Sequence, residues 1–243
     1  MTMNGRKIVI TGSTGTIGCA IAKVFAGKGA QLVLHCHERR DVAEELCEIT
    51  RKMGARAIVI KSDLSKTENI VALVSESIKA MGGIDTLIHA AATFEETPIG
   101  SVDEALWNRV IDIDLKAAFF LAQEIATHMK AAGGNMIFLS DLSASKPYGS
   151  YLPYCMSKAG IDAMVKGLAK TFAPKIRVNA IAPYVVSRPE GLSDEGWNDL
   201  ITKIPLKRPS SPQEIARIAR MLCENDSTIT GQVIVVDGGR MLR

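Results

Sequence analysis

Short apolar runs alternate with helical patterns along the whole chain, and this alternation restricts the fold more than any other feature. The runs are continuously apolar, which is typical of strands that helices cover on both faces. We expect strands at residues 7–10, 30–36, 56–63, 84–91, 135–140, 175–183 and 232–239. Such alternation predicts a parallel, doubly wound sheet with right-handed crossovers, whose ligands bind at the carboxyl ends of the strands.

Apolar residues at helical spacing place the helices between these strands. Ile17, Ile21 and Phe25 recur at this spacing after the first strand, and two glycines close the segment. Longer helices are expected to start near Leu106 and to run from about residue 154 to residue 172. Residues 184–210 break the rhythm with polar residues, proline and glycine, so we expect a substrate loop there.

Length and composition indicate one domain and exclude several classes of partner. The chain has 243 residues, 47% of them hydrophobic, which fits a single α/β domain over residues 1–243 with one large core. We expect a Rossmann-type sheet of about seven strands with helices on both faces. A net charge of +3 is too mild to indicate nucleic acid, and no stretch is apolar enough for a membrane span or a signal peptide. The five scattered cysteines predict reduced thiols in a cytoplasmic protein and no metal site.

The segment "TGSTGTIG", residues 11–18, follows the first predicted strand and opens the first helix. Its glycines allow close approach of the backbone to a pyrophosphate, and the helix N-terminus offers free N–H groups and a partial positive charge. This context favours a dinucleotide site over a tight turn without a ligand.

Residues at the next two strand tips bear on the choice of dinucleotide. No acid stands at the tip of the second strand, where it would bind a free ribose diol. Instead His37, Arg39 and Arg40 follow, and guanidinium groups suit a 2′-phosphate. We therefore expect NADPH, although Glu38 argues the other way and the arginines could simply begin a solvated helix face. Asp63, followed by Leu64, either accepts an adenine N–H or caps a helix.

Tyr154 and Lys158 are four residues apart and share one face of the predicted helix. An ammonium beside a phenol stabilises phenolate, so we expect the pKa of Tyr154 to be lowered from about 10. Such a tyrosine transfers a proton near neutral pH. The pair therefore predicts acid–base chemistry at the carboxyl edge of the sheet.

Over essentially its whole length the chain resembles a short-chain dehydrogenase/reductase. The resemblance rests on "TGSTGTIG", the tyrosine–lysine pair, "WNRVIDIDLKAAFFL" (107–121), "RVNAIAP" (177–183) and "TGQVIVVDGG" (230–239). It implies hydride transfer from a nicotinamide, with Tyr154 as the acid–base and Lys158 as the ribose ligand. The implied dinucleotide-binding residues are Gly12, Ser13, Thr14, Thr16, Ile17, Gly18, His37, Arg39, Arg40, Asp63, Leu64, Ala90, Ala91, Tyr154, Lys158, Pro183 and Val186. A homotetramer or homodimer is also implied.

The chain departs from the family pattern at several positions. Thr16 replaces the middle glycine of the loop, "HAAA" (89–92) replaces Asn-Asn-Ala-Gly, and Tyr184 replaces a glycine. Two departures fall on catalytic positions, because Asp114 stands where asparagine is usual and Asp141 where serine is usual. Ordinary ketone reduction is therefore in question.

Asp141, thirteen residues before Tyr154, has opposite effects on two kinds of substrate. An ionised carboxylate repels the negative charge that grows on a carbonyl oxygen. At about 4 Å and an effective dielectric constant near 20, this repulsion is about 4 kcal/mol, or about a thousandfold in rate. A C=N bond gains a proton as its carbon gains hydride, so there the same carboxylate attracts. A protonated Asp141 would need a raised pKa, whereas we expect Lys158 to lower it.

Within the family, the arrangement is most similar to the pteridine reductases, including the bacterial dihydromonapterin reductases. "HCHERR" (35–40), "AATFEETPIG" (91–100) and "LSD" (139–141) resemble segments of those enzymes. The resemblance implies a substrate site formed by Phe94, Asp141, Tyr154 and Tyr184, with Phe94 stacked on a pterin and both Asp141 oxygens on its N–H groups. The catalytic set is then Tyr154, Lys158, Asp141 and Asp114.

Three functions follow from these observations. The first is NADPH-dependent reduction of a C=N bond in a dihydropteridine. The second is an NADPH-dependent carbonyl reductase, acting on a 3-oxoacyl thioester or small ketone, in which Asp141 is tolerated. The third is a catalytically silent regulator that binds the cofactor. No nucleic acid, membrane or metal enters any of them.

Overall fold

The computed structural model describes residues 3–129, 133–189, 191–224 and 227–243. Among these residues the strands form one seven-stranded sheet in the order β3-β2-β1-β4-β5-β6-β7, and every pairing is parallel. The strands are β1 (Lys7–Thr11), β2 (Gln31–Cys36), β3 (Arg56–Lys61), β4 (Thr86–His89), β5 (Gly134–Leu139), β6 (Ile176–Pro183) and β7 (Val233–Val236). The predicted doubly wound α/β sheet is confirmed.

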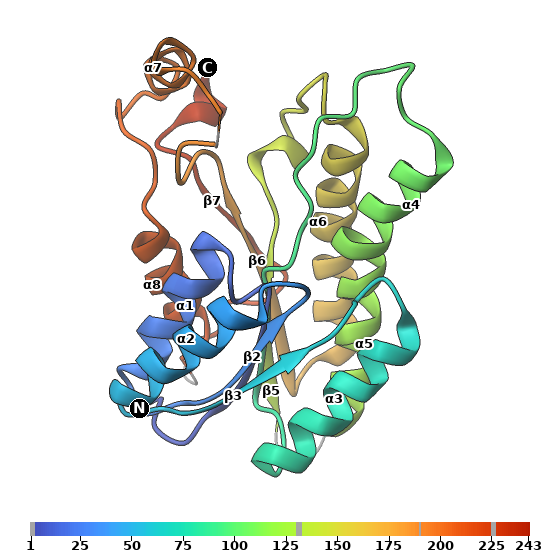
Figure 1. Ribbon diagram of the computed structural model, residues 1–243, viewed down its shortest axis with the longest axis vertical. Coiled ribbons are helices and arrows are strands. Elements are labelled where there is room, and N and C mark those ends of the chain that lie inside the picture. The colour runs from blue at the N-terminus through green and yellow to red at the C-terminus, as the bar shows by residue number, and fades with distance from the viewer. Residues whose placement is uncertain (1–2, 130–132, 190, 225–226) are drawn as a thin grey trace.

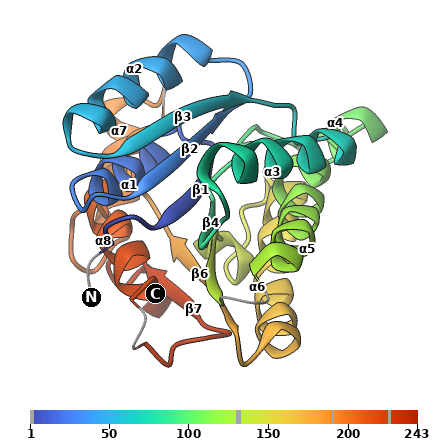
Figure 2. The same cartoon turned by 90° about the horizontal axis from the view of Figure 1, so that it is seen from below.

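Helices cover both faces of the sheet (Figures 1 and 2). Helices α1, α2 and α8 lie on one side, and α3, α5 and α6 lie on the other. The helices are α1 (Thr16–Ala26), α2 (Arg40–Lys52), α3 (Thr67–Met81), α4 (Glu104–Ile111), α5 (Ala117–Met129), α6 (Leu152–Phe172), α7 (Asp194–Thr202) and α8 (Pro212–Leu222).

The buried apolar residues form one cluster on each face of the sheet. In β1, Ile8 packs with α1 and α8, whereas the next residue, Val9, packs with α3, α5 and α6. Successive strand residues point to opposite faces, so a strand covered on both sides must be apolar at every position. The expected single core is therefore wrong, because the sheet divides the buried residues into two layers.

Two strands are only half as long as predicted. The prediction of residues 84–91 becomes β4 at Thr86–His89, and residues 232–239 become β7 at Val233–Val236. At the end of β7, the carboxylate of Asp237 accepts hydrogen bonds from the backbone N–H groups of Gly239 and Met241, at 2.8 and 2.6 Å. These bonds turn the chain away from the sheet, although its sequence remains strand-like.

The predicted helix near Leu106 is interrupted by a π-helical stretch. Helix α4 begins at its N-cap Asp103, whose carboxylate accepts the N–H of Leu106 at 2.7 Å. Residues Asp112–Lys116 then form five residues of π-helix before α5 begins at Ala117. Such stretches are rare and are frequently found at functional sites. Here the stretch contains Asp114, which is buried.

The predicted substrate loop at residues 184–210 contains a helix of its own. Helix α7 begins at Ser193, whose hydroxyl oxygen accepts the N–H of Gly196 at 3.1 Å. None of its described residues is buried, and it lies beside the C-terminus at one end of the molecule (Figure 1). No helix of the described ranges is long and apolar enough to cross a membrane. Nor does that part of the chain hold a group of three or more His, Cys, Asp or Glu suited to a metal ion.

Candidate active site

Two cavities adjoin at the carboxyl ends of the strands. One, of about 770 Å³, is lined by Asp141 and the four tyrosines of the chain, and we call it the tyrosine cavity. The other, of about 750 Å³, is lined by His35, His37 and Asp63, and we call it the histidine cavity. Gly15, Ala90 and Ala92 line both cavities. An elongated ligand can therefore extend from one into the other.

The loop between β1 and α1 is packed too closely for side chains. Gly12 has a φ of +64°, and a Cβ added there would lie 2.6 Å from the backbone of Ala91. A Cβ on Gly18 would lie 2.3 Å from the carbonyl oxygen of Gly12. Gly15 caps α1 without a side-chain hydrogen bond, so the helix N-terminus is left for other partners. These features suit the pyrophosphate of a dinucleotide.

His35 supports this loop from β2, and the sequence analysis missed it. Its Nδ1 accepts the backbone N–H of Gly12 at 3.3 Å, and its Nε2 lies 2.9 Å from the carbonyl oxygen of Ser62. The ring is therefore neutral with its proton on Nε2. Burial lowers the pKa of His35 to about 4, in agreement with this tautomer. Ser13, predicted as a ligand, is buried and donates its hydroxyl to the carbonyl of His35.

The residues after β2 divide between the cavity and the surface. His37, Glu38 and Arg39 line the histidine cavity, and Nη2 of Arg39 donates to the carbonyl and hydroxyl oxygens of Thr14 at 3.1 and 3.3 Å. Arg40 instead pairs with Glu44 on the outside of α2 at 3.3 Å, and it is not among the lining residues. The structure thus brings Arg39, but not Arg40, to the predicted cofactor site.

The other predicted cofactor residues line the two cavities. At the tip of β3, the carboxylate of Asp63 accepts the N–H of Ser65 at 3.0 Å and still faces the histidine cavity. Gly12, Thr14, Leu64 and Ala91 also line the histidine cavity. Thr16, Ile17, Gly18, Pro183 and Val186 line the tyrosine cavity, while Ala90 lines both. Tyr184, which was predicted for the substrate, also lines the tyrosine cavity.

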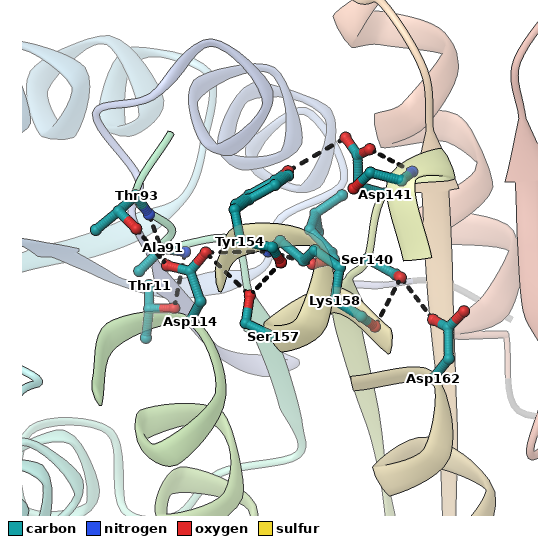
Figure 3. A network of polar contacts seen from close by, with 12 residues as sticks. Thr11, Ala91, Thr93, Asp114, Ser140, Asp141, Tyr154, Ser157, Lys158 and Asp162 are labelled. Carbon is teal, nitrogen blue, oxygen red and sulfur yellow. Dashed lines mark hydrogen bonds and ion pairs between the residues drawn. The ribbon is translucent and has the colours of Figure 1, made fainter. Parts of the chain in front are cut away.

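Asp141, two residues after the end of β5, receives three hydrogen bonds, and Figure 3 shows the one from Tyr154. The Tyr154 hydroxyl donates to its Oδ2 at 3.2 Å. The backbone N–H of Ser143 and the Tyr148 hydroxyl donate to its Oδ1 at 2.7 and 3.3 Å. Both lone pairs of Oδ1 are thus used and one of Oδ2 remains. Asp141 can accept one substrate N–H through Oδ2, so the expected grip through both oxygens would require displacing a partner.

Lys158 lies deep behind the tyrosine. Its side chain is 2% exposed, and its Nζ donates to the Leu139 carbonyl at 3.0 Å. The same nitrogen is 4.0 Å from Oδ2 of Asp114 and 5.3 Å from the centroid of the Tyr154 ring. The pair from one helix face is therefore brought together as predicted.

The electrostatic effect on the tyrosine is the reverse of the prediction. Burial raises the pKa of Tyr154 well above its usual value, and the negative charges of Asp141 and Asp114 raise it further. Burial also raises the pKa of Asp141, against the opposing hydrogen bonds from Ser143 and the charge of Lys158. Both expectations of lowered pKa values were wrong, because they counted the ammonium of Lys158 and left out desolvation and the second carboxylate.

Asp114 connects three segments beneath the cavities (Figure 3). Its Oδ1 accepts the backbone N–H and the hydroxyl of Thr93, at 2.6 and 3.1 Å. Its Oδ2 accepts the hydroxyl of Ser157 at 3.5 Å. The residue lines neither cavity, and burial raises its pKa. This geometry is that of a positioning residue, which holds the loop after β4 against α6.

Aromatic rings form the outer wall of the tyrosine cavity. Phe94 is 55% exposed and stacks on Tyr151, with ring centroids 4.6 Å apart and planes at 12°. Its ring also meets the edge of Tyr154 at 5.0 Å, while Tyr148 lies 6.4 Å from Tyr184. The sequence analysis missed Tyr148 and Tyr151. Tyr148, Tyr151 and Tyr154 follow one another at intervals of three residues, and this clustering of tyrosines was the signal available in the sequence.

Comparison with known proteins agrees with this architecture. The family model described as "Enoyl-(Acyl carrier protein) reductase" matches residues 12–240. Glucose 1-dehydrogenase 2 of Bacillus subtilis (strain 168) is 32% identical over 99% of this chain and 96% of its own length. Cis-4-hydroxycyclohexanecarboxylate dehydrogenase of Sinomonas cyclohexanicum is 31% identical over 96% of each chain. The crystal structure of a dehydrogenase/reductase from Sinorhizobium meliloti 1021 has a TM-score of 0.92 and 26% identity, covering 98% of this chain and 96% of its own.

Proposed function

Because the chain belongs to the short-chain dehydrogenase/reductase family, it is an oxidoreductase that uses a nicotinamide cofactor, and we propose that it reduces a dihydropteridine with NADPH. The bond reduced is the C=N bond between ring atoms C6 and N5. The observation that supports this best is the carboxylate of Asp141, whose Oδ2 accepts the Tyr154 hydroxyl at 3.2 Å where the family usually has serine.

The residues around the β1–α1 loop would hold the dinucleotide. When bound, the cofactor supplies a hydride to the substrate carbon. Gly12, Gly18 and the N-terminus of α1 suit its pyrophosphate. Arg39 and His37 in the histidine cavity suit a 2′-phosphate, which supports NADPH over NADH. Lys158 would bind the nicotinamide ribose, as in the family.

The proton chemistry depends on Tyr154 and Asp141 acting together. The raised pKa of Tyr154 keeps the phenol protonated, and a phenolate beside Asp141 would be costly. The raised pKa of Asp141 lets this carboxyl carry a proton closer to neutral pH. When Oδ2 of Asp141 is protonated, the hydrogen bond of the structure reverses, so that Asp141 donates to the Tyr154 hydroxyl and this hydroxyl donates to N5. As Tyr154 gives its proton to N5, it can then receive one from Asp141. One proton is thereby shared among N5, Tyr154 and Asp141.

Where this proton rests distinguishes a C=N bond from a C=O bond. An imine nitrogen is basic enough to hold it, which leaves an ionised Asp141 beside a cation that readily accepts hydride. A ketone oxygen is far less basic, so the proton stays on Asp141 and the carbon remains a weaker electrophile. The exposed ring of Phe94 supports a flat heteroaromatic substrate, since stacked aromatic rings attract.

A carbonyl reductase is the second candidate, because a buried Asp141 with a raised pKa can also donate a hydrogen bond to a ketone oxygen. In either case we propose that the described residues of the 184–210 segment close over the substrate, since Leu192 and Leu200 line the tyrosine cavity. A homotetramer or homodimer located in the cytoplasm completes the proposal.

The test is NADPH oxidation by the purified protein with a 7,8-dihydropterin and an acetoacetyl thioester side by side. Turnover of the dihydropterin alone is expected. Turnover of the thioester alone would establish the carbonyl reductase. Tight NADPH binding without turnover of either would indicate a regulator.

A further inference from the structure

The charges that line the tyrosine cavity are unevenly distributed. In the described part of the chain they belong to Glu96, Asp141 and Lys158. The ammonium of Lys158 lies at the inner wall, where it donates to the Leu139 carbonyl and is 4.0 Å from Oδ2 of Asp114. Glu96 is solvent-exposed, so the accessible end of the cavity carries a negative charge without a cationic lining residue.

Glu96 is held in place by the wall of the cavity. The Tyr151 hydroxyl donates to its Oε1 at 3.2 Å. Thr97 forms a β-bridge with Tyr151, and its backbone N–H donates to the Ser150 carbonyl at 2.6 Å. Phe94, two residues before Glu96, stacks on the ring of the same Tyr151. The carboxylate thus sits beside the ring that would stack on the substrate, with Oε2 left to accept further hydrogen bonds.

The preceding residue provides an internal contrast. Glu95 binds the guanidinium of Arg109 through both oxygens, at 2.9 and 3.2 Å. It is not among the lining residues of either cavity. Of these two neighbouring glutamates, Glu95 is therefore paired with Arg109 outside the cavities, and only Glu96 places its charge in the tyrosine cavity.

We propose that Glu96 is a specificity-determining residue that selects substrates with an uncharged, hydroxyl-bearing substituent and rejects those with a carboxylate or phosphate tail. This inference rests on the proposed function for the identity of the substrate as a pteridine. The preference for uncharged over anionic substituents does not depend on that identity. A carboxylate accepts hydrogen bonds from hydroxyl groups and repels anions. Because the site is open to solvent, salt screens the repulsion.

The test compares 7,8-dihydrofolate with its dimethyl ester, which differ in charge at one end. At low ionic strength the wild-type protein should have a kcat/KM about fivefold higher for the ester, as expected for a partly exposed charge pair. This difference in kcat/KM between ester and acid should disappear in about 1 M salt, where the Debye length is about 3 Å. Glu96→Gln should remove it at all salt concentrations, and Glu95→Gln should leave it unchanged.

A second comparison measures hydroxyl recognition. Glu96→Gln should lower kcat/KM about threefold for a dihydropterin with a trihydroxypropyl group at C6, because the hydroxyl then donates to a neutral amide oxygen instead of a charged carboxylate. With 6-methyl-7,8-dihydropterin, which lacks hydroxyl groups, the variant should equal the wild type. An unchanged melting temperature accompanies both results, because the side chain of Glu96 is exposed.

The outcomes for Glu96 and for the proposed function differ. If a ketone is reduced and no dihydropterin is, the dihydropteridine proposal fails, and the same variants are then compared with a keto acid and its methyl ester. Equal rates for acid and ester in the wild type overturn the inference in either series. So does a Glu95→Gln variant that removes the difference between ester and acid as fully as Glu96→Gln. Inactivity in both series overturns both proposals.

Discussion

Replacing Asp141 by asparagine removes one charge at nearly constant shape. In the structure, Oδ2 of Asp141 is 3.2 Å from the Tyr154 hydroxyl oxygen, the group that would contact the reacting nitrogen. A protonated substrate nitrogen in contact with the Tyr154 hydroxyl would lie about 4 Å from the Asp141 carboxylate, the separation used in this estimate. With an effective dielectric constant near 20, the lost attraction is about 4 kcal/mol. This energy corresponds to about a thousandfold in rate.

We therefore expect Asp141→Asn to lower kcat/KM for a 7,8-dihydropterin by about a thousandfold. Asp141→Ser, which introduces the residue usual in the family, should lower it similarly and should raise any activity with an acetoacetyl thioester. The assay is NADPH oxidation followed by absorbance. The matched control is the affinity for NADPH, which should stay within about twofold because the dinucleotide is bound mainly by other residues.

The same variant has an effect on the pH profile whose sign is fixed. Burial raises the pKa of Tyr154 first, and the charge of Asp141 raises it next. Removing that charge lowers the pKa, so the phenol loses its proton at a lower pH. A reaction that needs protonated Tyr154 should then lose activity at a lower pH in Asp141→Asn than in the wild type. A dihydropterin rate that survives the substitution, or equal losses for both substrates, would refute the charge argument.

Three further predictions concern other parts of the site. Phe94→Ala should raise KM for a dihydropterin about fivefold with little change in melting temperature, because the ring is 55% exposed and its stacking is worth about 1 kcal/mol. Arg39→Ala should raise KM for NADPH at least about tenfold and leave KM for NADH unchanged, whereas Arg40→Ala, on the outside of α2, should affect neither. Gly18→Ala should destabilise the fold by about 1–3 kcal/mol, measured by urea unfolding, because its Cβ would lie 2.3 Å from a carbonyl oxygen; Gly167→Ala, with nothing within 4 Å, is the matched control.

The sheet could be predicted because its strands carry their own signal. Ile8 and Val9 are both apolar since the helices on both faces bury them, and no water-facing side interrupts the pattern. The π-helical stretch around Asp114 could not be predicted in this way. It replaces the usual i→i+4 backbone hydrogen bonds by i→i+5 bonds over five residues, and propensity and apolar periodicity do not signal this replacement.

Residues of the candidate site whose proximity depends on local spacing lie together as the sequence predicts, whereas contacts between distant residues were missed. Tyr154 and Lys158 are four residues apart in α6, so they share a helix face whenever this helix forms, and their proximity follows from the sequence. The contacts of Tyr148 with Asp141, and of His35 with Gly12, depend on how loops cross the sheet edge. The pKa directions also depend on burial, which a sequence motif does not contain.

The division of the core by the sheet has a consequence for the active site. The loop that we propose binds the pyrophosphate precedes α1, whose Ile21 packs in one apolar layer, whereas Tyr154 lies on α6, whose Ile161 packs in the other. The proposed cofactor loop and Tyr154 are therefore supported by different apolar layers, and the strands between the layers fix the distance between them. A looser packing of one layer would disturb one of the two while the other stayed intact. Cofactor affinity and proton delivery can thus diverge independently in evolution.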